Sequence, residues 1–440
     1  MKFVALIGLF IVFSVVTCER ITQPTISKAV VELVPEAVMV TEAWFSIKTE
    51  RPDAGLTVAL ERDGKEVLRF TGLKDTVVAD SGLQPGHGYT YRLRLYRSGK
   101  GVGPTPPVSI TTLDTTSHDI EWTVYDIPSP YGSGVLYDVA IVDENDIWAV
   151  GEIYSDSNQT WLPYNAVHWD GKKWELGRVY FPIVCGQNSL TPYPSKAVLA
   201  FDNNEIWISS SGDKLAILKN GKQIDQFCLP RSVAMSINKM WGIFSKSKDF
   251  YICGYNGLIG HFDGEQWHRI ESGTDLPLRD IWGVWNIFKH RYQILAIGSD
   301  IFSFKPSQVL EIFPDSSIQQ STQGLPNSIT GIWGWKGIEW YISGDGVYYR
   351  RYSQEKWDKV DEVSSVFTRS VRGMGPTDVF VAGDFGYLAH WNGKSWYRYT
   401  TFPGNVDWYQ LAVSRDIVVA VGVSVKGFRV DGGVILMGHR

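Results

Sequence analysis

The sequence is poor in cysteine and has no excess of basic residues. Four cysteines occur in 440 residues, and none stands in a CxxC or CxxH spacing, so no structural zinc site is predicted. The 42 basic residues are outnumbered by 47 acidic ones, which argues against a nucleic-acid partner. These patterns predict neither a metal nor a cofactor. Hydrophobic residues make up 44% of the chain, enough to bury a core over most of its length.

Long hydrophobic runs are also missing beyond the first residues. Lys2 precedes an apolar run from Phe3 to Val16, which is too short to span a bilayer and is typical of a secretory signal peptide. The segment VVTC, ending at Cys18, resembles the lipobox of bacterial lipoproteins, which implies that Cys18 is acylated. A soluble secreted product and an uncleaved anchor are the alternatives. We expect a signal peptide over residues 1–17 and a tether over residues 18–23.

Short alternating strands separated by turns follow over residues 24–114. Between two of them, Asp63-Gly64 predicts a tight hairpin turn. The segment LQPGHGYTYRL resembles the LxPGxxY motif of fibronectin type III domains, which leads into a long strand. The resemblance implies a seven-strand sandwich with Tyr89 at the tyrosine corner and Trp44 in the core. We expect a fibronectin type III domain over residues 24–114.

Three nearly identical heptapeptides recur in the rest of the chain: HWDGKKW from His168, HFDGEQW from His261 and HWNGKSW from His390. Their spacings of 93 and 129 residues are two and three steps of roughly 45, the length of a four-stranded propeller repeat. The equivalent segments from Leu218 and Arg351 lack the histidine, so we interpret the three histidines as structural and not as a ligand set. The Asx-Gly pairs predict left-handed turns between antiparallel strands, and the flanking aromatic residues predict packing between sheets.

Two further markers repeat with the same period. Seven apolar segments, six of which end in glycine, finish at residues 151, 210, 254, 298, 344, 383 and 422. Upstream of four of them lie KMWGIF, DIWGVW, GIWGWK and SVRGMG. We expect these to be innermost strands along a central channel, where glycine relieves crowding. The repeats also explain most of the 18 tryptophans.

The two ends of the repeat region are expected to pair with each other. Residues 119–127, DIEWTVYDI, resemble the outer strand KSWYRYT of the preceding repeat, whereas the chain stops at GGVILMGHR before such a strand. Pairing would complete the last repeat and remove an unprotected sheet edge. The region resembles secreted bacterial β-propellers with IWG…DVxAVG…HWDGxxW repeats. The expected fold is all-β: a fibronectin type III sandwich plus a seven-bladed β-propeller over residues 118–440, closed by an N-terminal outer strand, with six or eight blades as alternatives.

Familiar enzyme motifs are missing. The sequence has no GxSxG nucleophile elbow, no HExxH zinc motif and no P-loop. Arg231, Arg279, Arg369 and Arg372 lie at repeat starts near the expected channel, where a sialidase-like site would need an arginine cluster. Without a FRIP-like segment beside them, we interpret these arginines as partners in surface or channel salt bridges. No catalytic residue is predicted, and a glycan-active hydrolase or lyase at the channel mouth is the alternative function.

Insertions in the first repeat predict where a ligand binds. The loop EIYSDSNQTWLPYN and the crossing RVYFPIVCGQNSLTPYPS are long and aromatic, and propeller topology places both at the channel mouth. The candidate ligand-binding residues are Tyr154, Trp161, Tyr164, Tyr180, Tyr193 and Trp408. The alternative is that these rings fold over the sheet edges. Cys185 and Cys228, on successive crossings, form a possible disulfide or are two buried thiols, and Cys253 is expected in the core.

The sequence therefore favours a non-catalytic binding protein whose propeller recognises an extracellular glycan or protein. A scaffold for the assembly of envelope proteins is a third candidate. We expect a monomeric, secreted or outer-membrane-anchored lipoprotein of a bacterium. Its membrane contact would be the N-terminal lipid anchor, and no nucleic-acid partner is predicted.

Overall fold

The computed structural model describes residues 31–155, 162–202, 204–246, 248–303, 305–363, 366–427 and 429–440. Within these ranges the regular structure is β-strand apart from one short turn of 3-10 helix, η1 (Tyr255–Gly257), so the all-β class is confirmed. The predicted signal peptide, the tether and Cys18 lie outside the described residues. Across the described part of the chain, no helix has the length and apolar character needed to cross a membrane.

The first of two compact units comprises the chain up to Pro35 together with Trp44–Asp80 and Gly88–Ile110. The strands of this region form two sheets. One sheet contains β1 (Val31–Val38), β2 (Glu42–Thr49) and β5 (Thr76–Ser81). The other contains β4 (Lys65–Leu73), β3 (Asp53–Arg62), β6 (Gly88–Arg97) and β7 (Lys100–Pro104), with β8 (Val108–Thr111) paired to β6. Asp63 and Gly64 join β3 to β4 with φ values of 49° and 79°, which is the expected left-handed turn.

The core of this region contains the expected tryptophan and one tyrosine. Trp44 is buried on β2. On β6 the fully buried tyrosine is Tyr91, whose hydroxyl donates a hydrogen bond of 2.7 Å to Asp80. Tyr89 is half-buried, with the guanidinium of Arg62 at 5.6 Å from its ring centre. Tyr89 lies near the start of β6, and Tyr91 lies two residues further along the strand.

The second unit comprises Glu36–Ala43, Ser81–His87 and Thr111–Arg440. Its described residues include seven four-stranded antiparallel sheets. The first four are β10 (Gly134–Asp143), β11 (Asp146–Ile153), β12 (Tyr164–Trp169), β13 (Trp174–Gly177); β16 (Ser195–Ala200), β17 (Glu205–Ser210), β18 (Lys214–Lys219), β19 (Lys222–Cys228); β20 (Ile237–Gly242), β21 (Phe250–Gly254), β22 (Ile259–Phe262), β23 (Trp267–Ile270); and β24 (Leu278–Asn286), β25 (Arg291–Gly298), β26 (Gln308–Ile312), β27 (Ser317–Gln320).

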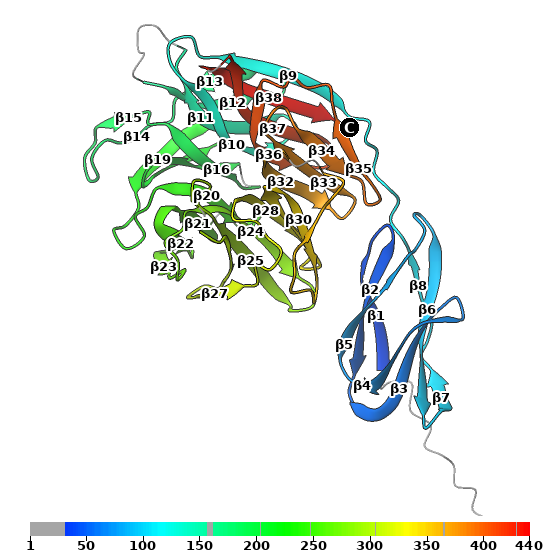
Figure 1. Ribbon diagram of the computed structural model, residues 1–440. Helices are drawn as coiled ribbons and strands as arrows, with labels where there is room; N and C mark the ends of the chain where they lie inside the picture. Colours follow the sequence, from blue (N-terminus) through cyan, green and yellow to red (C-terminus); the bar gives the residue numbers. More distant parts are fainter. Residues whose placement is uncertain are drawn as a thin grey trace, which may run out of the picture. The chain divides into compact units, whose positions relative to one another are not determined.

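The remaining three sheets complete a ring. They are β28 (Ile329–Trp335), β29 (Glu339–Gly344), β30 (Gly346–Arg351), β31 (Asp358–Lys359); β32 (Thr368–Gly375), β33 (Asp378–Gly383), β34 (Leu388–Trp391), β35 (Trp396–Tyr399); and β36 (Val406–Val413), β37 (Ile417–Lys426), β38 (Arg429–His439), β9 (Glu121–Pro128). The first strand of each sheet contacts the first strand of the next, and β36 contacts β10 (Figure 1). A separate hairpin of β14 (Phe181–Pro182) and β15 (Leu190–Thr191) lies between the first two sheets in sequence.

The last sheet combines strands from the two ends of this unit. β9 pairs antiparallel with β38, with Glu121 opposite His439 and Pro128 opposite Gly432. This confirms the pairing expected from the resemblance of residues 119–127 to an outer strand. Because β9 covers the outer side of β38, the last sheet has no unpaired edge at that strand.

The repeated heptapeptide forms the hairpin between the third and fourth strands of a sheet. In each copy the Asx side chain accepts hydrogen bonds of 2.9 to 3.0 Å from two backbone N–H groups that follow it. The next residues, Gly171, Gly264 and Gly393, have φ values of 86°, 101° and 94°, so the predicted left-handed turns are confirmed. The heptapeptide tryptophan begins the fourth strand and packs on the ring opposite, as Trp174 does on Trp169 at 5.5 Å.

The heptapeptide histidines are bonded within their own sheets. Each Nε2 lies 2.9 to 3.1 Å from an aspartate at the start of the second strand, in the pairs His168–Asp146, His261–Asp249 and His390–Asp378. Each imidazole also stacks at 4.2 Å on the aromatic residue opposite it in the second strand. In the part of the chain that the structure describes, no group of three or more His, Cys, Asp or Glu side chains could hold a metal ion. The contacts of the three histidines agree with a structural role.

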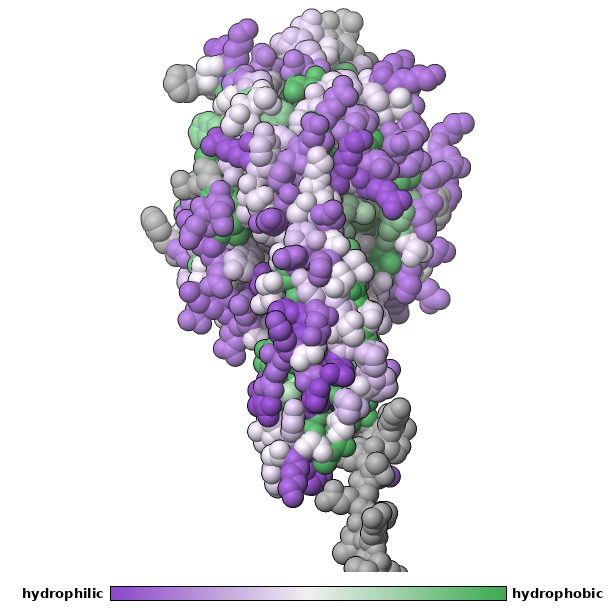
Figure 2. Space-filling view, turned by 90° about the vertical axis from the view of Figure 1, so that its right-hand side faces the viewer, coloured by the Kyte–Doolittle hydropathy of each residue, from purple (hydrophilic) through white to green (hydrophobic). Residues whose placement is uncertain are grey.

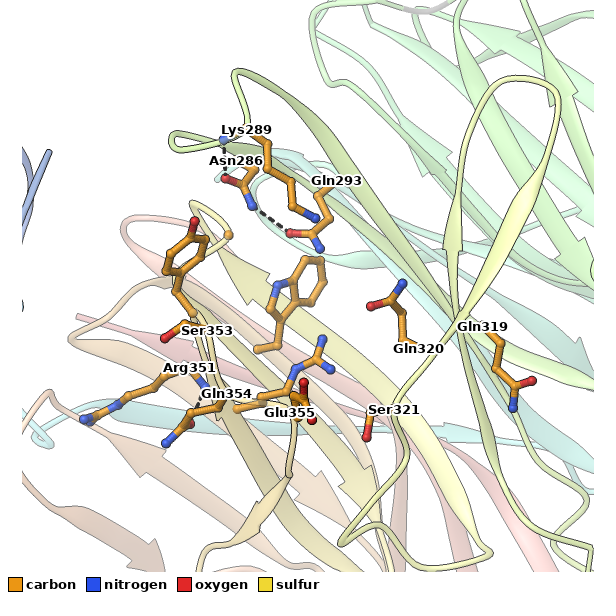
Figure 3. A pocket seen from close by; sticks show the side chains of 14 residues that line it. Asn286, Lys289, Gln293, Gln319, Gln320, Ser321, Arg351, Ser353, Gln354 and Glu355 are labelled. Carbon is orange, nitrogen blue, oxygen red and sulfur yellow. Dashed lines mark hydrogen bonds between the residues drawn. The ribbon is translucent and has the colours of Figure 1, made fainter. Parts of the chain in front are cut away.

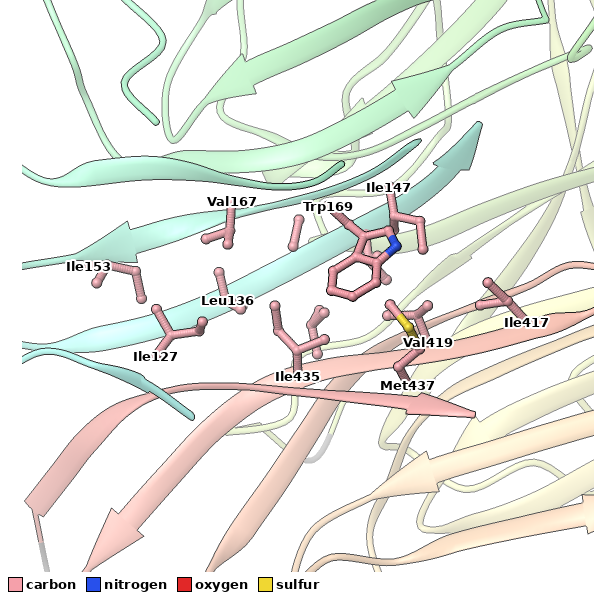
Figure 4. Packing of buried hydrophobic residues seen from close by; sticks show 13 residues of the cluster. Ile127, Leu136, Ile147, Ile153, Val167, Trp169, Ile417, Val419, Ile435 and Met437 are labelled. Atoms are coloured by element: carbon pink, nitrogen blue, oxygen red, sulfur yellow. The ribbon is translucent and has the colours of Figure 1, made fainter. Parts of the chain in front are cut away.

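Hydrophobic cores lie between neighbouring sheets. In the core shown in Figure 4, Leu136 and Val167 of the first sheet pack with Val419 and Ile435 of the last sheet, which joins the two ends of the ring. The face shown in Figure 2 is mainly hydrophilic, with hydrophobic residues in small groups. The apolar side chains of the clusters thus join one sheet to the next.

The glycines of the first strands serve this packing. A Cβ added to Gly283 would lie 2.4 Å from the ring of Trp241 in the preceding sheet, and one on Gly373 would lie 3.0 Å from the ring of Trp333. We expected glycine here because of crowding along the channel. At Gly283 the closest approach is to a tryptophan of the neighbouring sheet, whereas the nearest atom to a Cβ on Gly373 is the carbonyl oxygen of Asp378 in its own sheet, at 2.4 Å.

Candidate functional site

Every sheet of the ring has a β-bulge near the start of its first strand. In β10, pairing with β11 passes from Leu136 to Asp138, and equivalent register shifts occur in the other six first strands. A bulge takes one residue out of the regular alternation and redirects its side chain. The seven bulge residues that result are Tyr137, Lys196, Asn238, Arg279, Thr330, Arg369 and Tyr409. All seven line one cavity of about 220 Å³, which marks the mouth of the central channel. We call it the mouth cavity.

In five of the seven sheets, a glycine of the second strand lies against the backbone carbonyl beside the bulge. A Cβ at Gly151 would lie 2.0 Å from the carbonyl oxygen of Val135, and one at Gly254 would lie 2.1 Å from that of Ser236. The same approach to a backbone carbonyl, at 2.0 to 2.3 Å, occurs at Gly344, Gly383 and Gly422. A side chain at these positions would displace the carbonyl and with it the bulge. In these five sheets the glycine therefore positions the bulge residue, whereas the sheets of Lys196 and Arg279 have Ser210 and Gly298 at this place, without such an approach.

A buried ion pair joins three sheets at the floor of the mouth cavity. The Asp280 carboxylate accepts two hydrogen bonds from the Arg372 guanidinium, at 2.9 and 3.0 Å. It also accepts the backbone N–H of Ile281 at 3.0 Å and that of Ile332, in the next sheet, at 2.9 Å. Asp280 and Arg372 are only 2% and 4% exposed, so the floor is held by charges that water does not reach.

Asp138 makes the equivalent contacts on the opposite side of the ring. It follows the bulge in β10 as Asp280 does in β24, and it accepts the backbone N–H groups of Val139, at 2.9 Å, and of Val198 in the next sheet, at 3.0 Å. Its cationic partner is Lys239, two sheets further on. Two aspartates at the same place in the repeat thus each tie three consecutive sheets together.

Two cations of the mouth cavity have no carboxylate partner among the described residues. The Lys196 ammonium lies 3.8 Å from the ring centre of Tyr137. The Arg279 Nε donates a hydrogen bond of 2.8 Å to the backbone carbonyl of Ser299. Arg369, by contrast, is paired with Asp384. Burial lowers the pKa of Lys196 to about 8 and moves the pKa of Arg279 below its usual value. An anion entering the cavity would compensate both charges.

Tyrosines form part of the cavity wall. The rings of Tyr137 and Tyr409 are stacked at 6.4 Å, and the Arg369 guanidinium lies 4.6 Å from the centre of the Tyr409 ring. The Tyr137 hydroxyl donates a hydrogen bond of 2.8 Å to Glu152. Burial raises the pKa of both tyrosines, which keeps their hydroxyl groups protonated at neutral pH. The wall therefore combines aromatic surface with hydroxyl groups close to the cations.

Exposed aromatic residues stand in the loops that leave the second strands at this end of the sheets. Phe302 follows β25 and is 91% exposed, and Phe385 follows β33 and is 70% exposed. Tyr255, after β21, is exposed and lines the mouth cavity. Phe385 has a φ of 58°, which is an unfavourable conformation for a bulky residue. Its backbone N–H donates a hydrogen bond of 3.0 Å to the Asp407 carboxylate. Large exposed rings around a polar cavity are typical of a binding surface.

The predicted ligand-binding residue Trp408 is not exposed. It is completely buried in a core with Leu411 and Leu436, so its assignment to the exposed mouth is wrong. The bulge explains the error: Trp408 precedes the extra residue Tyr409 and faces the space between sheets, whereas Tyr409 faces the cavity. Trp161, also predicted to bind ligand, lies outside the described residues.

The four predicted tyrosines lie along the first sheet and its crossing. Tyr154 is linked to the mouth cavity through Glu152. Its hydroxyl donates a hydrogen bond of 3.4 Å to this carboxylate, which also accepts the Tyr137 hydroxyl. Tyr164 is half-buried, with the Arg178 guanidinium 3.9 Å from its ring centre. Tyr193 packs on the core between the first two sheets, and Tyr180 is exposed. The structure therefore does not bring the four together as one pocket.

The arginines singled out by sequence are closer to the site than the tyrosines. Arg279 and Arg369 line the mouth cavity, and Arg372 holds its floor through Asp280. Arg231 is exposed and is not among the residues that line the cavity. Lys196, the second unpaired cation, was missed. Asn238, Arg279, Thr330 and Arg369 each stand directly before a first-strand marker, but the repeat of Lys196 lacks that marker, so no signal distinguished it.

The long crossing is attached to the second sheet by a disulfide between Cys185 and Cys228, whose Cα atoms are 5.8 Å apart. Cys185 lies between β14 and β15, and Cys228 ends β19. Cys253 is a buried free thiol. The bridge adds a covalent link to a segment that also contacts the second sheet through Phe181 and through the hydrogen bonds between Tyr180 and Gln223.

Comparison with known proteins supports the fold. No family model and no curated protein matches the sequence. A structure of YCF48 bound to D1 peptide is similar with a TM-score of 0.53 and 15% identity, covering 72% of this chain and 95% of that one. YCF48 from Cyanidioschyzon merolae gives a TM-score of 0.52 at 15% identity, covering 72% and 98%. The WD40 domain of Pan2 from Neurospora crassa gives 0.48 at 12% identity, covering 74% and 97%. Together with the ring of four-stranded sheets, the similarity to YCF48 shows a β-propeller fold.

Proposed function

We propose that the chain is a non-catalytic binding protein whose propeller, with the seven sheets as blades, receives an extended segment of a partner protein at the mouth cavity. The first unit is proposed to be a fibronectin type III domain that acts as a spacer. On the strength of the N-terminal sequence, Cys18 is proposed as the lipid-attachment site of a secreted or outer-membrane-anchored bacterial lipoprotein. The partner is therefore expected outside the cytoplasm.

The proposal depends mainly on the two unpaired cations, Lys196 and Arg279. Both side chains are half-buried, and a carboxylate bound to them would form charge-assisted hydrogen bonds worth about 1.5 to 3 kcal/mol each. A carboxylate carried by a polypeptide would also place neighbouring side chains against the exposed rings of Phe302 and Phe385, in the loops that leave the second strands. A neutral glycan would leave both cations uncompensated, so a protein ligand is favoured over it.

A protein of similar fold offers a precedent for such a ligand. YCF48 has been observed bound to D1 peptide. At 15% identity the resemblance concerns the fold, and the choice of ligand in this chain depends on its own cavity residues.

The test is a binding screen of the full chain against peptides that carry an internal Asp or Glu, a free C-terminal carboxylate or an amidated C-terminus. We expect acidic peptides to bind, and the amidated set to show whether the carboxylate comes from the chain end or from a side chain. Lys196→Gln combined with Arg279→Gln should weaken binding at least tenfold, about 1.4 kcal/mol. Lys222→Gln, which changes an exposed lysine on β19, is the matched control and should bind normally.

The pH dependence of binding provides a second readout. Because the pKa of Lys196 is lowered to about 8, its charge is lost as the pH rises from 7 to 9, and affinity should fall over that range. Arg279 stays charged throughout, so binding should weaken without vanishing. Equal affinity of the double variant and the wild type for every bound peptide would refute the proposed function.

A further inference from the structure

A second recess, independent of the mouth cavity, lies between the sheets β24–β27 and β28–β31. It is a groove of about 590 Å³ lined by the β24–β25 connection, the end of β27 and the turn after β30 (Figure 3). Asn286, the last residue of β24, lines this groove, whereas Arg279 near the start of the same strand lines the mouth cavity. The two recesses therefore lie at opposite ends of the same strand.

Amide side chains dominate the lining of this groove. They are Asn286, Gln293, Gln319, Gln320 and Gln354. The side-chain NH₂ of Asn286 donates a hydrogen bond of 2.9 Å to the side-chain carbonyl of Gln293. The side-chain oxygen of Asn286 accepts hydrogen bonds from the backbone N–H groups of Phe288 and Lys289, at 3.0 and 2.9 Å. This arrangement fixes Gln293 and leaves its NH₂ group available. Gln319 and Gln320, on the opposite side, make no side-chain hydrogen bond within the described residues.

A buried guanidinium lies beside these amides without an acceptor. Arg350 is 8% exposed, lines the groove and lies 4.6 Å from the ring centre of the buried Trp357. Its guanidinium makes neither a hydrogen bond nor an ion pair with any described residue. The nearby Glu311 is already bonded to Arg291 at 2.6 Å and to Lys289 at 3.2 Å. Burial lowers the pKa of Arg350.

A guanidinium is planar and presents its N–H donors in one plane, which matches the two oxygens of a carboxylate. Amides offer a donor and an acceptor side by side, which matches hydroxyl groups, since each hydroxyl also both donates and accepts. The groove offers little apolar surface to a peptide side chain, because the indole of Trp340 is 3% exposed.

We propose that this groove binds a saccharide that carries a carboxylate, with Arg350 holding the carboxylate and the surrounding amides holding hydroxyl groups. The proposal is independent of the peptide site at the mouth cavity. It gives the chain a second, polar ligand on the other end of the propeller.

Calorimetric titration of the full chain with a galacturonic acid trisaccharide tests this site, with the neutral galactose trisaccharide and a triglutamate peptide as comparisons. We expect the acidic saccharide to bind at least tenfold more tightly than either comparison. Arg350→Gln should reduce that affinity at least tenfold. Gln320→Ala, at a half-buried side chain without a partner, should reduce it severalfold, and it decides the matter if Arg350→Gln fails to fold.

Arg398→Gln is the matched control, because Arg398 also stacks on an aromatic ring, at 5.1 Å from Tyr387, but in another sheet. It should bind the saccharide normally, and so should the Lys196→Gln, Arg279→Gln variant. Absence of binding, equal binding of the neutral saccharide, tighter binding of the peptide, or full affinity in both groove variants would overturn the proposal.

Discussion

Replacing Arg372 by methionine tests whether the floor of the mouth cavity depends on its buried ion pair. The Asp280 carboxylate accepts two hydrogen bonds from this guanidinium and one each from the N–H groups of Ile281 and Ile332. Methionine keeps an unbranched apolar stem near the ring of Trp282, where the guanidinium now lies at 4.9 Å. The substitution removes the two charge-assisted bonds and leaves a buried carboxylate without its cation.

The expected loss follows from the burial of both partners. Removing one member of a buried, hydrogen-bonded ion pair costs about 3 to 5 kcal/mol. Two backbone N–H groups continue to face Asp280, so we expect the lower end of that range, about 3 kcal/mol, for unfolding of the second unit. Asp280→Asn should also destabilise the fold, because it leaves Arg372 buried without a carboxylate. The double variant should lose less than the sum of the two single variants, since both break the same interaction.

Urea-induced unfolding followed by tryptophan fluorescence measures these differences at neutral pH. Lys173→Met is the control, because it breaks a pair with Glu175 in which both side chains are more than half exposed, and no measurable loss is expected. A loss below about 1 kcal/mol in Arg372→Met, or strictly additive losses in the double variant, would refute the assignment of this ion pair as a support of the cavity floor.

Two further predictions concern the bulges and the closing strand. Gly254→Ala should destabilise the second unit by about 1 to 3 kcal/mol, because the added Cβ would lie 2.1 Å from the Ser236 carbonyl. Gly404→Ala is the control and should cause no loss, because no atom lies within 4 Å of its added Cβ. Thermal melting of the two variants measures the difference. His118 and His390 face each other with their Nδ1 atoms 3.0 Å apart, and burial lowers the pKa of both. Neutral imidazoles are thus favoured in the folded state, so stability should be complete above about pH 6.5 and fall as the pH drops below it. His118→Phe should flatten this dependence in melting curves between pH 5 and 8, and an unchanged slope would contradict the role of the pair.

The repeat architecture could be predicted because its causes are local. An Asx-Gly turn needs a left-handed backbone, and the Asx-Gly pair occurs in all three copies of the heptapeptide. The pairing of β9 with β38 could be predicted because an unpaired edge is unfavourable and one segment resembled the missing strand. These inferences needed spacing and turn chemistry alone.

The site could not be predicted because a bulge changes which side chains face the cavity. Regular alternation along β36 gives no reason to prefer Tyr409 over Trp408, and the register shift between Trp408 and Gln410 decides it. The cause of the shift is the contact between Gly422 and the carbonyl of Asp407, two residues from different strands. Sequence spacing revealed the glycine but not the carbonyl that it faces.

The separation between fold and site makes the binding proposal testable by substitution. Five of the bulges lie against glycines that face carbonyl groups, and the sheets are joined by aromatic residues of the hairpins and by Asp138 and Asp280. Lys196 takes part in neither; its described contact is with the ring of Tyr137. Because burial lowers its pKa to about 8, the charged form is disfavoured in the folded state, and Lys196→Gln should leave stability unchanged or raise it. Under the proposed function this charge is kept for a ligand, and a Lys196→Gln variant that melted well below the wild type would contradict that proposal.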